Sequence, residues 1–274
     1  MPGRATPTDT SFAHFGRLDR IELHHGRYAA LAFPKHSHDE YVIGLNYSGI
    51  EQVWLDGKSF DVPPGKITVY NPGEVQASSC QAEDGWEFKS LYLDHQAVAE
   101  ALGDDWATGG QREINLPLID DPVLFTLLDR LDTQALVTAT EDQHCLMIDF
   151  IGRLFTSYGR ARRPGRLERG HPSLRRVAAY IHDHLTETIR LEDLASLAGL
   201  SPYHLLRAYR AATGFPPHQY QLQLRIRQAK QMLRSGRQIA DIAADLGFVD
   251  QGHLHRLFRR IVGVTPGQYR RGVA

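Results

Sequence analysis

The chain is poor in cysteine, with only Cys80 and Cys145 in 274 residues. So few thiols cannot build the disulfide framework of a small secreted protein, and we expect both to be reduced and structural. No apolar stretch is long enough to cross a bilayer, and no secretory leader is recognisable. These absences favour a cytoplasmic protein without a membrane partner.

The chain also lacks net charge, since 31 basic residues face 32 acidic ones and the formal charge is −1. This balance conceals two unlike parts. Residues 166–274 carry 17 basic and 8 acidic side chains, a net charge of +9, whereas residues 1–165 carry −10. Such asymmetry predicts a polyanionic partner for the C-terminal part alone.

An internal repeat occupies the last third of the chain. Alanine followed four residues later by glycine occurs as Ala195 with Gly199, and again about 48 residues on as Ala243 with Gly247. A small residue lets two helices cross closely, and glycine suits the left-handed residue that ends a helix. The repeat therefore predicts two helix-turn-helix motifs.

Ser201 and Asp250 follow these glycines and are expected to cap the second helix of each motif. The motifs then span about 191–212 and 239–261, and the segment 217–234 between them has apolar positions for the long central helix that the family resemblance described next implies.

Three runs in this region resemble the DNA-binding domain of AraC/XylS-family transcription regulators over about residues 172–271. They are Leu-x-x-Leu-Ala-x-x-x-Gly-Leu-Ser-x-x-x-Leu from Leu191, Ile-Ala-x-x-x-Gly-Phe from Ile242, and Gly-x-x-Pro-x-x-Tyr-Arg from Gly263. The resemblance implies an all-α domain that places the second helix of each motif in adjacent major-groove segments of double-stranded DNA.

The resemblance also implies which side chains meet DNA. In the first motif they are Tyr203, His204, Arg207 and Arg210, and in the second Gln251, Gly252, His253, Arg256 and Arg260. Gly252 departs from the family pattern because it brings no side chain. Leu206 stands where the family commonly has a polar residue that contacts bases. Phosphate contacts are expected from arginines, which make affinity salt-sensitive: Arg175, Arg207, Arg225, Arg256, Arg259 and Arg260.

The first half has short alternating runs separated by turn residues such as Asp56-Gly57 and Pro63-Pro64-Gly65. Such runs predict an all-β barrel or sandwich. The expected strands are 28–33, 41–47, 51–55, 66–70 and 86–93, and the expected helices are 95–102, 122–137 and 141–158.

The fold class is therefore multidomain, with an N-terminal all-β barrel or sandwich, which the resemblance given next makes a cupin-like barrel, followed by helices and a C-terminal all-α domain. We place the barrel and its helices at 1–158, with a mobile tail over 1–10. A Gly-, Pro- and Arg-rich linker at 159–172 and the DNA-binding domain at 173–274 follow, the latter opening with Ser173 as a helix cap.

His36-Ser37-His38-x-Glu40-Tyr41 and Asn71-Pro72-Gly73-Glu74 resemble the cupin-like effector domain that precedes many AraC-type domains. A barrel interior is a usual place for one small ligand. The candidates to line it, which could equally be packing residues, are His36, His38, Tyr41, Trp54, Tyr70 and Gln76.

Enzymatic cupins bind a metal through His-x-His, a following Glu and a later His. Here no Glu stands at the usual spacing after His38, and Gln76 replaces the later His. Two good ligands are too few for a tight site, so neither a metal nor another cofactor is expected.

Three functions compete. The favoured one is a regulator, not an enzyme, whose barrel binds a small-molecule effector that alters how the readers engage a promoter. The others are a constitutive regulator with a purely dimerising barrel and a metal-dependent cupin enzyme fused to a DNA-binding domain. The resemblance further implies a homodimer formed by helices 122–137 and 141–158, and contact with RNA polymerase.

Overall fold

The computed structural model describes residues 7–15, 18–102, 112–131, 141–162 and 166–273. Between Arg162 and Arg163 the chain divides into two compact units. The first unit is built on a β-sheet with helices, and the second is helical. They are called the sheet unit and the helical unit below.

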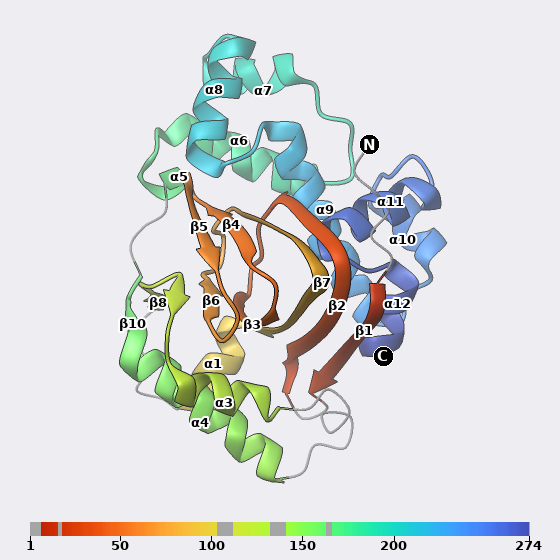
Figure 1. The fold of residues 1–274 in the computed structure, drawn as a ribbon. Coiled ribbons are helices and arrows are strands. Elements are labelled where there is room, and N and C mark those ends of the chain that lie inside the picture. Colours follow the sequence, from red (N-terminus) through yellow and green to blue (C-terminus); the bar gives the residue numbers. More distant parts are fainter. Residues whose placement is uncertain (1–6, 16–17, 103–111, 132–140, 163–165, 274) are drawn as a thin grey trace. The chain divides into compact units, whose positions relative to one another are not determined.

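In the described residues of the sheet unit, eight antiparallel strands form one sheet in the order β1-β2-β7-β3-β6-β9, with β4 joined to β7 and β5 to β4. The longest strands, β2 and β7, have 19 and 18 residues. Strand β7 pairs with β3 through its last residues and with β4 through its first, so the sheet rolls over on itself (Figure 1). The strands are β1 (Pro7–Phe15), β2 (Leu18–His36), β3 (Tyr41–Ser48), β4 (Glu51–Leu55), β5 (Lys58–Val62), β6 (Ile67–Tyr70), β7 (Gln76–Leu93) and β9 (Leu118–Ile119).

The sequence predicted the barrel strands in fragments. The expected strands 28–33 and 86–93 are the later parts of β2 and β7. Their other halves were missed because buried polar residues such as Glu22, His24 and Gln76 interrupt the apolar alternation. The turn at Asp56-Gly57 is confirmed, since φ is 47° and 97° there and β4 and β5 form a hairpin around it.

The sheet has two faces that carry alternate residues of each strand. In β3, Tyr41, Ile43 and Leu45 belong to the core under the helices, whereas Val42 packs in a separate cluster on the opposite face. We call these the helix-covered face and the inner face. Helices α1 (His95–Leu102), α3 (Pro122–Asp129) and α4 (Glu141–Tyr158) supply the other half of the helix-covered core (Figure 1).

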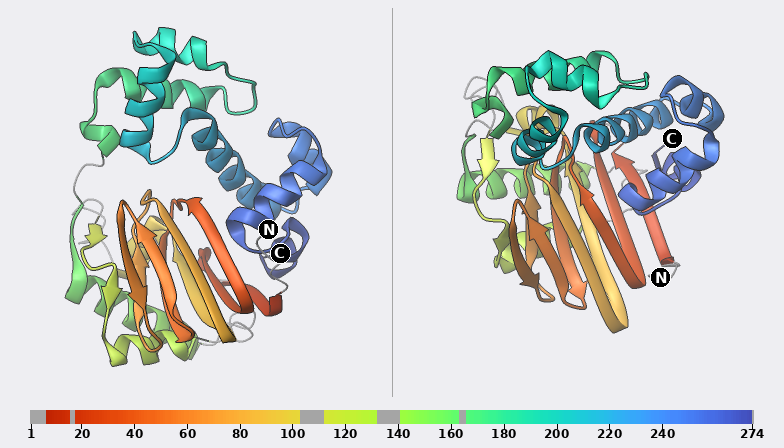
Figure 2. Two further views of the ribbon diagram at one scale, coloured as in Figure 1. Left: turned by 45° about the horizontal axis from the view of Figure 1, so that its top comes forward. Right: turned by 90° about the horizontal axis from the view of Figure 1, so that it is seen from above.

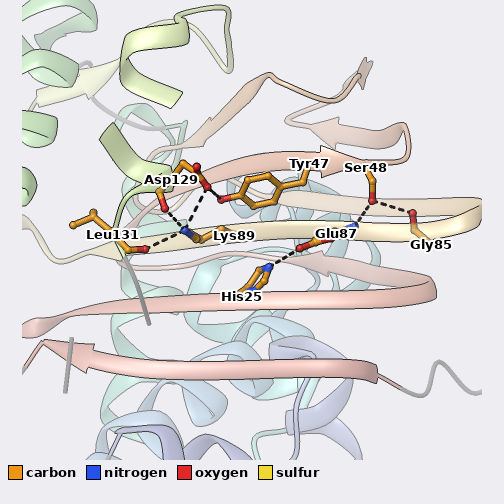
Figure 3. Close-up of polar contacts among 8 residues, drawn as sticks. All are labelled: His25, Tyr47, Ser48, Gly85, Glu87, Lys89, Asp129 and Leu131. Atoms are coloured by element: carbon orange, nitrogen blue, oxygen red, sulfur yellow. Dashed lines mark hydrogen bonds and ion pairs between the residues drawn. The ribbon is translucent and has the colours of Figure 1, made fainter. Parts of the chain in front are cut away.

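Helices α1 and α4 begin and end where the sequence predicts. Helix α3 begins as predicted with Asp121 as its cap but ends at Asp129, short of the expected 137, and residues 132–140 lie outside the described part. The reason for its end is Lys89 of β7, whose Nζ donates to the carbonyl oxygens of Asp129 at 2.6 Å and Leu131 at 3.0 Å (Figure 3). A cation there satisfies carbonyls that a helix end leaves open.

The expected linker 159–172 is only partly irregular, which corrects the sequence interpretation. Strand β10 (Gly159–Ala161) pairs with β8 (Arg112–Ile114), and α5 (Arg166–Arg169) is a short helix. The cap of α6 (Pro172–Asp183) is also corrected from Ser173 to His171, whose Nδ1 accepts the amide of Ser173. Proline fits the first turn of a helix, so the cap and the start of the helix lie two residues earlier than expected.

Two smaller expectations also change. The N-terminal tail was expected to be mobile over residues 1–10, but Pro7–Thr10 belong to β1, and residues 1–6 lie outside the described part. Both cysteines are free; Cys80 is buried, whereas Cys145 is exposed on α4 and has no structural role in a core.

The helical unit consists of two helix-turn-helix motifs on either end of one long helix. The first motif is α7 (Leu191–Ala198) with α8 (Pro202–Thr213), and the second is α10 (Ile239–Asp245) with α11 (Gln251–Val262). Helix α9 (Pro217–Arg234), which the sequence predicted with these bounds, runs between them (Figure 2). Helix α12 (Pro266–Val273) follows. None of the described helices combines the length and apolar character that a bilayer crossing requires.

Candidate DNA interface and effector face

The turns of both motifs have the predicted backbone geometry. Gly199 and Gly247 are left-handed, with φ of 66° and 68°. Ser201 Oγ accepts the amide of His204 at 3.3 Å, and Asp250 Oδ1 accepts the amide of His253 at 2.6 Å. Each second helix therefore starts at a side-chain cap directly after its turn.

In the first motif, α8 presents its predicted readers to solvent. Tyr203 is 63% exposed, and Arg207 and Arg210 are exposed as well. The guanidinium of Arg207 lies 5.7 Å from the centre of the Tyr203 ring, so the two side chains form one surface. His204 is exposed but turns back toward the cap, with its Nδ1 2.9 Å from Ser201 Oγ.

In the second motif, α11 exposes Gln251, Gly252, Arg256 and Arg260. His253 is half-buried, and its ring packs edge-on against the ring of Phe248, with 5.7 Å between the two ring centres. His253 therefore also packs against the core of the motif. Val249, the extra residue of the second turn, is 86% exposed beside these side chains.

Gly252 lies where a side chain would be in tight contact with two neighbouring side chains, which would have to shift by a few tenths of an ångström. A Cβ built there would come within 3.2 Å of Asp250 Oδ1 and 3.3 Å of Arg256 Nη1. The missing side chain thus leaves room for the Arg256 guanidinium over the first turn of α11. This explains the departure from the family pattern better than a direct contact of Gly252 with DNA.

Arg225 was expected to bind phosphate, and this expectation is wrong. It is 8% exposed, and its guanidinium donates to the carbonyl oxygens of Leu185 at 2.8 Å, Glu187 at 2.9 Å and Gly247 at 2.7 Å. Gln221 Nε2 also donates to the carbonyl oxygens of Leu185 at 3.0 Å and Glu187 at 2.9 Å. Helix α9 therefore ties the loop after α6 to the turn of the second motif.

The helical period contained a signal for this role. Gln221 and Arg225 lie on one buried line of α9 at intervals of four residues. The members of that line are Pro217, Gln221, Arg225, Ala229 and Leu233. Arg175 is exposed, and its Nη1 donates to the carbonyl oxygens of Glu168 at 2.8 Å and Gly170 at 3.1 Å, so its expected phosphate contact stays a prediction.

On the inner face of the sheet, the structure brings together four of the six predicted effector residues. His36 and Gln76 are buried opposite each other, with 3.4 Å between His36 Nε2 and Gln76 Nε2. The His36 ring lies 4.8 Å from that of His38, and its Nδ1 lies 2.7 Å from the Pro34 carbonyl oxygen. Tyr70 is buried in the inner-face cluster.

The other two, Tyr41 and Trp54, do not face the interior, which corrects the prediction. Tyr41 belongs to the helix-covered core, packs edge-on against Phe155 at 5.1 Å and donates its hydroxyl to the Arg112 carbonyl. Trp54 is next to buried Val53 on β4 and therefore lies on the other face of that strand. Lys35 Nζ lies 3.3 Å from the centre of the Trp54 ring. The alternation of side chains between the two faces of β3 and β4 decides both cases.

Sequence reasoning missed several inner-face side chains. Burial, with a smaller contribution from His25, lowers the pKa of His24 to about 3, so this imidazole is neutral. Burial raises the pKa of Glu51 to about 7 although Ser78 and Tyr70 hydrogen-bond it. The missed residues are Glu22, His24, Tyr28, Glu51, Trp86, Phe88 and Tyr92. Side chains alternate between the two faces of a strand, so counting every second residue from the positions paired with Val42 could have identified those in β2 and β7.

Across the described ranges, no three His, Cys, Asp or Glu side chains gather closely enough to hold a metal ion. His36 and His38 are near each other, but the third neighbour is the amide of Gln76. An amide is a poor substitute for the imidazole of a cupin metal site.

Comparisons with known proteins identify both units. The AraC-like ligand binding domain matches residues 20–144, and a helix-turn-helix domain matches residues 194–272. The HTH-type transcriptional regulator YbfI of Bacillus subtilis is 28% identical over 81% of each chain. The MmsAB operon regulatory protein of Pseudomonas aeruginosa is 36% identical over 39% of this chain and 35% of its own.

Among solved structures, wild-type ToxT from Vibrio cholerae with a bound unsaturated fatty acid is similar in fold. Its TM-score is 0.54 at 14% identity, and the match covers 100% of this chain and 98% of that one. This match shows that the two chains share a fold.

Proposed function

The chain belongs to the AraC-type transcription regulators, with a ligand-binding unit and a DNA-binding unit, and we propose that a small effector on the inner sheet face alters promoter binding. Effector binding shifts a DNA-competent arrangement only if the effector binds two arrangements of the protein with different free energies. We assign effector binding and dimerisation to residues 1–158, and DNA binding to residues 173–274.

One observation carries the DNA-binding assignment. Two capped helices, α8 and α11, expose arginines at matching positions, Arg207 and Arg256, and the same buried helix supports both motifs. The clamp formed by Arg225 and Gln221 ties the second motif to the segment before the first. Two DNA-contacting helices, α8 and α11, that are held by the same helix α9 suit binding in adjacent major-groove segments.

Exposed apolar residues support the proposed homodimer. Val123 on α3 is 51% exposed and Ile148 on α4 is 37% exposed, although both helices are otherwise packed on the sheet. Burying such residues against a second copy would remove apolar surface from water. We propose that the dimer works in the cytoplasm, where the chromosome lies, and that it acts on transcription through RNA polymerase rather than as an enzyme.

In-vitro selection from a random-sequence DNA duplex library tests the proposal. The full chain is expected to enrich one sequence, and footprinting of it should protect roughly two helical turns per subunit, because adjacent groove segments lie about 34 Å apart. No enrichment over the starting library, or protection confined to one groove segment, would contradict the paired-reader function.

Arg207→Ala and Arg256→Ala serve as paired variants in the same selection, with exposed Arg130→Ala in the sheet unit as the control. Footprints of the selected duplex with and without a stabilising ligand would then show whether the sheet unit affects DNA binding. Identical footprints and affinities under both conditions would instead favour a constitutive regulator.

A further inference from the structure

The inner face of the sheet has the composition of a site for an organic cation. Its described aromatic rings form a connected series along β2 and β7. Tyr28 is stacked on Phe88 at 5.8 Å, and Trp86 lies 4.5 Å from Phe88. Phe33 contacts both Trp86 and His36, and the series continues through His38 to Tyr92 at 5.4 Å.

Carboxyl groups accompany these rings. Glu22 and Glu51 are 1% and 7% exposed. Glu22 lies directly across from Tyr92 in the β2–β7 register, and Glu51 lies near Ser78 and Tyr70, which lower its pKa against the larger effect of burial. After burial, the charged side chains that raise the pKa of Tyr92 are Glu22 and Glu40, and those that raise the pKa of Tyr70 are Glu51 and Glu74. Both phenols therefore lie close to carboxyl groups.

The basic side chains described on these strands lie elsewhere. Lys89 and Arg27 have the opposite parity, with Lys89 bound to the end of α3 and Arg27 exposed. Lys35 lies over Trp54, and Lys66 pairs with Asp120. Among the residues that the structure describes, the inner face thus combines carboxyl groups with aromatic rings and neutral polar groups.

Buried polar atoms on the same face point to a ligand. Trp86 is 2% exposed, and its Nε1 has no hydrogen-bond partner in the described structure. Asn46 is also 2% exposed, and its Oδ1 lacks a partner although its Nδ2 donates to Gly49 and Val62. A buried group without a partner is costly, so one free donor and one free acceptor suit a ligand with both complements.

From this arrangement we propose that the effector is an organic amine, held with its cationic group beside Glu51 and the rings of Tyr70 and Tyr92, which belong to one cluster of the inner face. A cation over an aromatic face is attracted by the ring quadrupole, and the attraction is largest where water is excluded. Burial keeps Glu51 protonated up to about pH 7, so Glu51 releases this proton to solvent when its carboxylate neutralises the charge that the ligand brings in. The inference rests on the proposed function, because it specifies the effector of that regulator.

Matched probes that differ only in charge test the proposal on the full chain. Tyramine, 4-ethylphenol and 4-hydroxyphenylacetate share a phenol ring and carry a positive, zero and negative charge. Choline and 3,3-dimethylbutan-1-ol form a second pair. Oleate represents an unsaturated fatty acid, the ligand type of ToxT. Thermal unfolding with each probe measures binding, because a ligand that binds only the folded state raises Tm.

We expect at least one of the two cations to raise Tm and to bind about tenfold or more tightly than its neutral partner, with no shift from the two anions. Equal shifts from neutral partners, a shift from either anion, or no shift from either cation would overturn the proposal. Selection of a DNA sequence is measured independently, so the regulator function stands or fails separately from the amine assignment.

Two variants locate the binding site. Glu51→Gln removes the charge at constant size, and Tyr92→Leu removes the ring, and each is expected to weaken cation binding about tenfold. Glu100→Gln, an exposed carboxyl on α1, is the matched control and should leave binding unchanged. Should one variant fail to fold, the other still decides, and full cation binding by a folded variant would overturn the assigned placement.

Discussion

At the scale of single residues, Arg207 and Arg256 occupy matching positions on α8 and α11, and both are exposed. Replacing either with alanine should weaken binding to the selected duplex by about 1–3 kcal/mol, because one base or phosphate contact is lost. Gel shifts measure the change, and Arg130→Ala is the control. Unchanged affinity in both variants would remove them from the interface.

Gly252 gives a sharper prediction, because its effects on stability and on DNA binding should have opposite signs. Gly252→Ala should stabilise α11 by up to about 1 kcal/mol, since alanine is the better helix former. It should weaken DNA binding, because its Cβ occupies space within 3.3 Å of Arg256 Nη1 and displaces that guanidinium.

A double-mutant cycle with Arg256→Ala checks this cause. If Gly252 acts through Arg256, the two losses in binding free energy will be clearly less than additive. Full additivity would show that Gly252 acts on DNA by another route, such as close approach of its backbone.

Glu51 makes stability depend on pH in a defined direction. Its folded pKa of about 7 lies above the usual 4.5, so the folded protein retains a proton that the unfolded chain releases. That stabilisation is fully present below the unfolded pKa and is lost as pH rises through the folded one.

The expected slope is at most about 1.4 kcal/mol per pH unit between these two values. Glu51→Gln should lack this component, so wild type should lose stability relative to the variant as pH rises through that window. Urea unfolding followed at several pH values measures the difference, and parallel pH profiles for the two proteins would contradict the assigned burial.

At the scale of elements, Arg225 of α9 joins two otherwise separate backbone segments through three carbonyl contacts, the loop after α6 and the turn of the second motif. Arg225→Ala should destabilise the helical unit by at least about 2 kcal/mol, since hydrogen bonds from a charged donor are lost together. The three tryptophans of the chain are Trp54, Trp86 and Trp106, all in the sheet unit. Tryptophan fluorescence should therefore report an unchanged transition while circular dichroism reports an earlier loss of helix.

Gln228→Ala on the exposed side of the same helix is the matched control. A helix transition in Arg225→Ala at the same midpoint as in this control would show that the clamp contributes little to stability. Gly247 belongs to the same junction, because a Cβ there would lie 2.1 Å from the Thr186 carbonyl oxygen. That close approach and the positive φ both require glycine.

At the scale of the whole molecule, the proposed dimer depends on apolar residues that the sheet unit leaves exposed. Val123→Glu and Ile148→Glu should convert the dimer to a monomer, because each places a charge in an apolar contact. Sedimentation measures the mass, and Leu116→Glu is a control at another exposed apolar residue. A dimer that survives both changes would place the interface elsewhere.

The motifs of the helical unit were predictable because their determinants are local. Glycine after a helix, a cap residue after the glycine and apolar positions every three or four residues act within one or two turns of chain. The bounds of α9 and the caps Ser201 and Asp250 followed from them. The end of α3 was not predictable in this way. Lys89, which binds the carbonyl oxygen of Asp129 at that end, lies about 40 residues earlier in strand β7.

The sequence by itself determined the fold class, the two readers and the uneven distribution of charge, because composition and short-range spacing carry this information. Only the tertiary structure decided which side of each strand faces inward, and so excluded Tyr41 and Trp54 while bringing Glu22 and Glu51 among aromatic rings. It also decided that Arg225 binds backbone rather than phosphate. Strand register and buried partners depend on segments far apart in the chain, and no local pattern specifies such pairings.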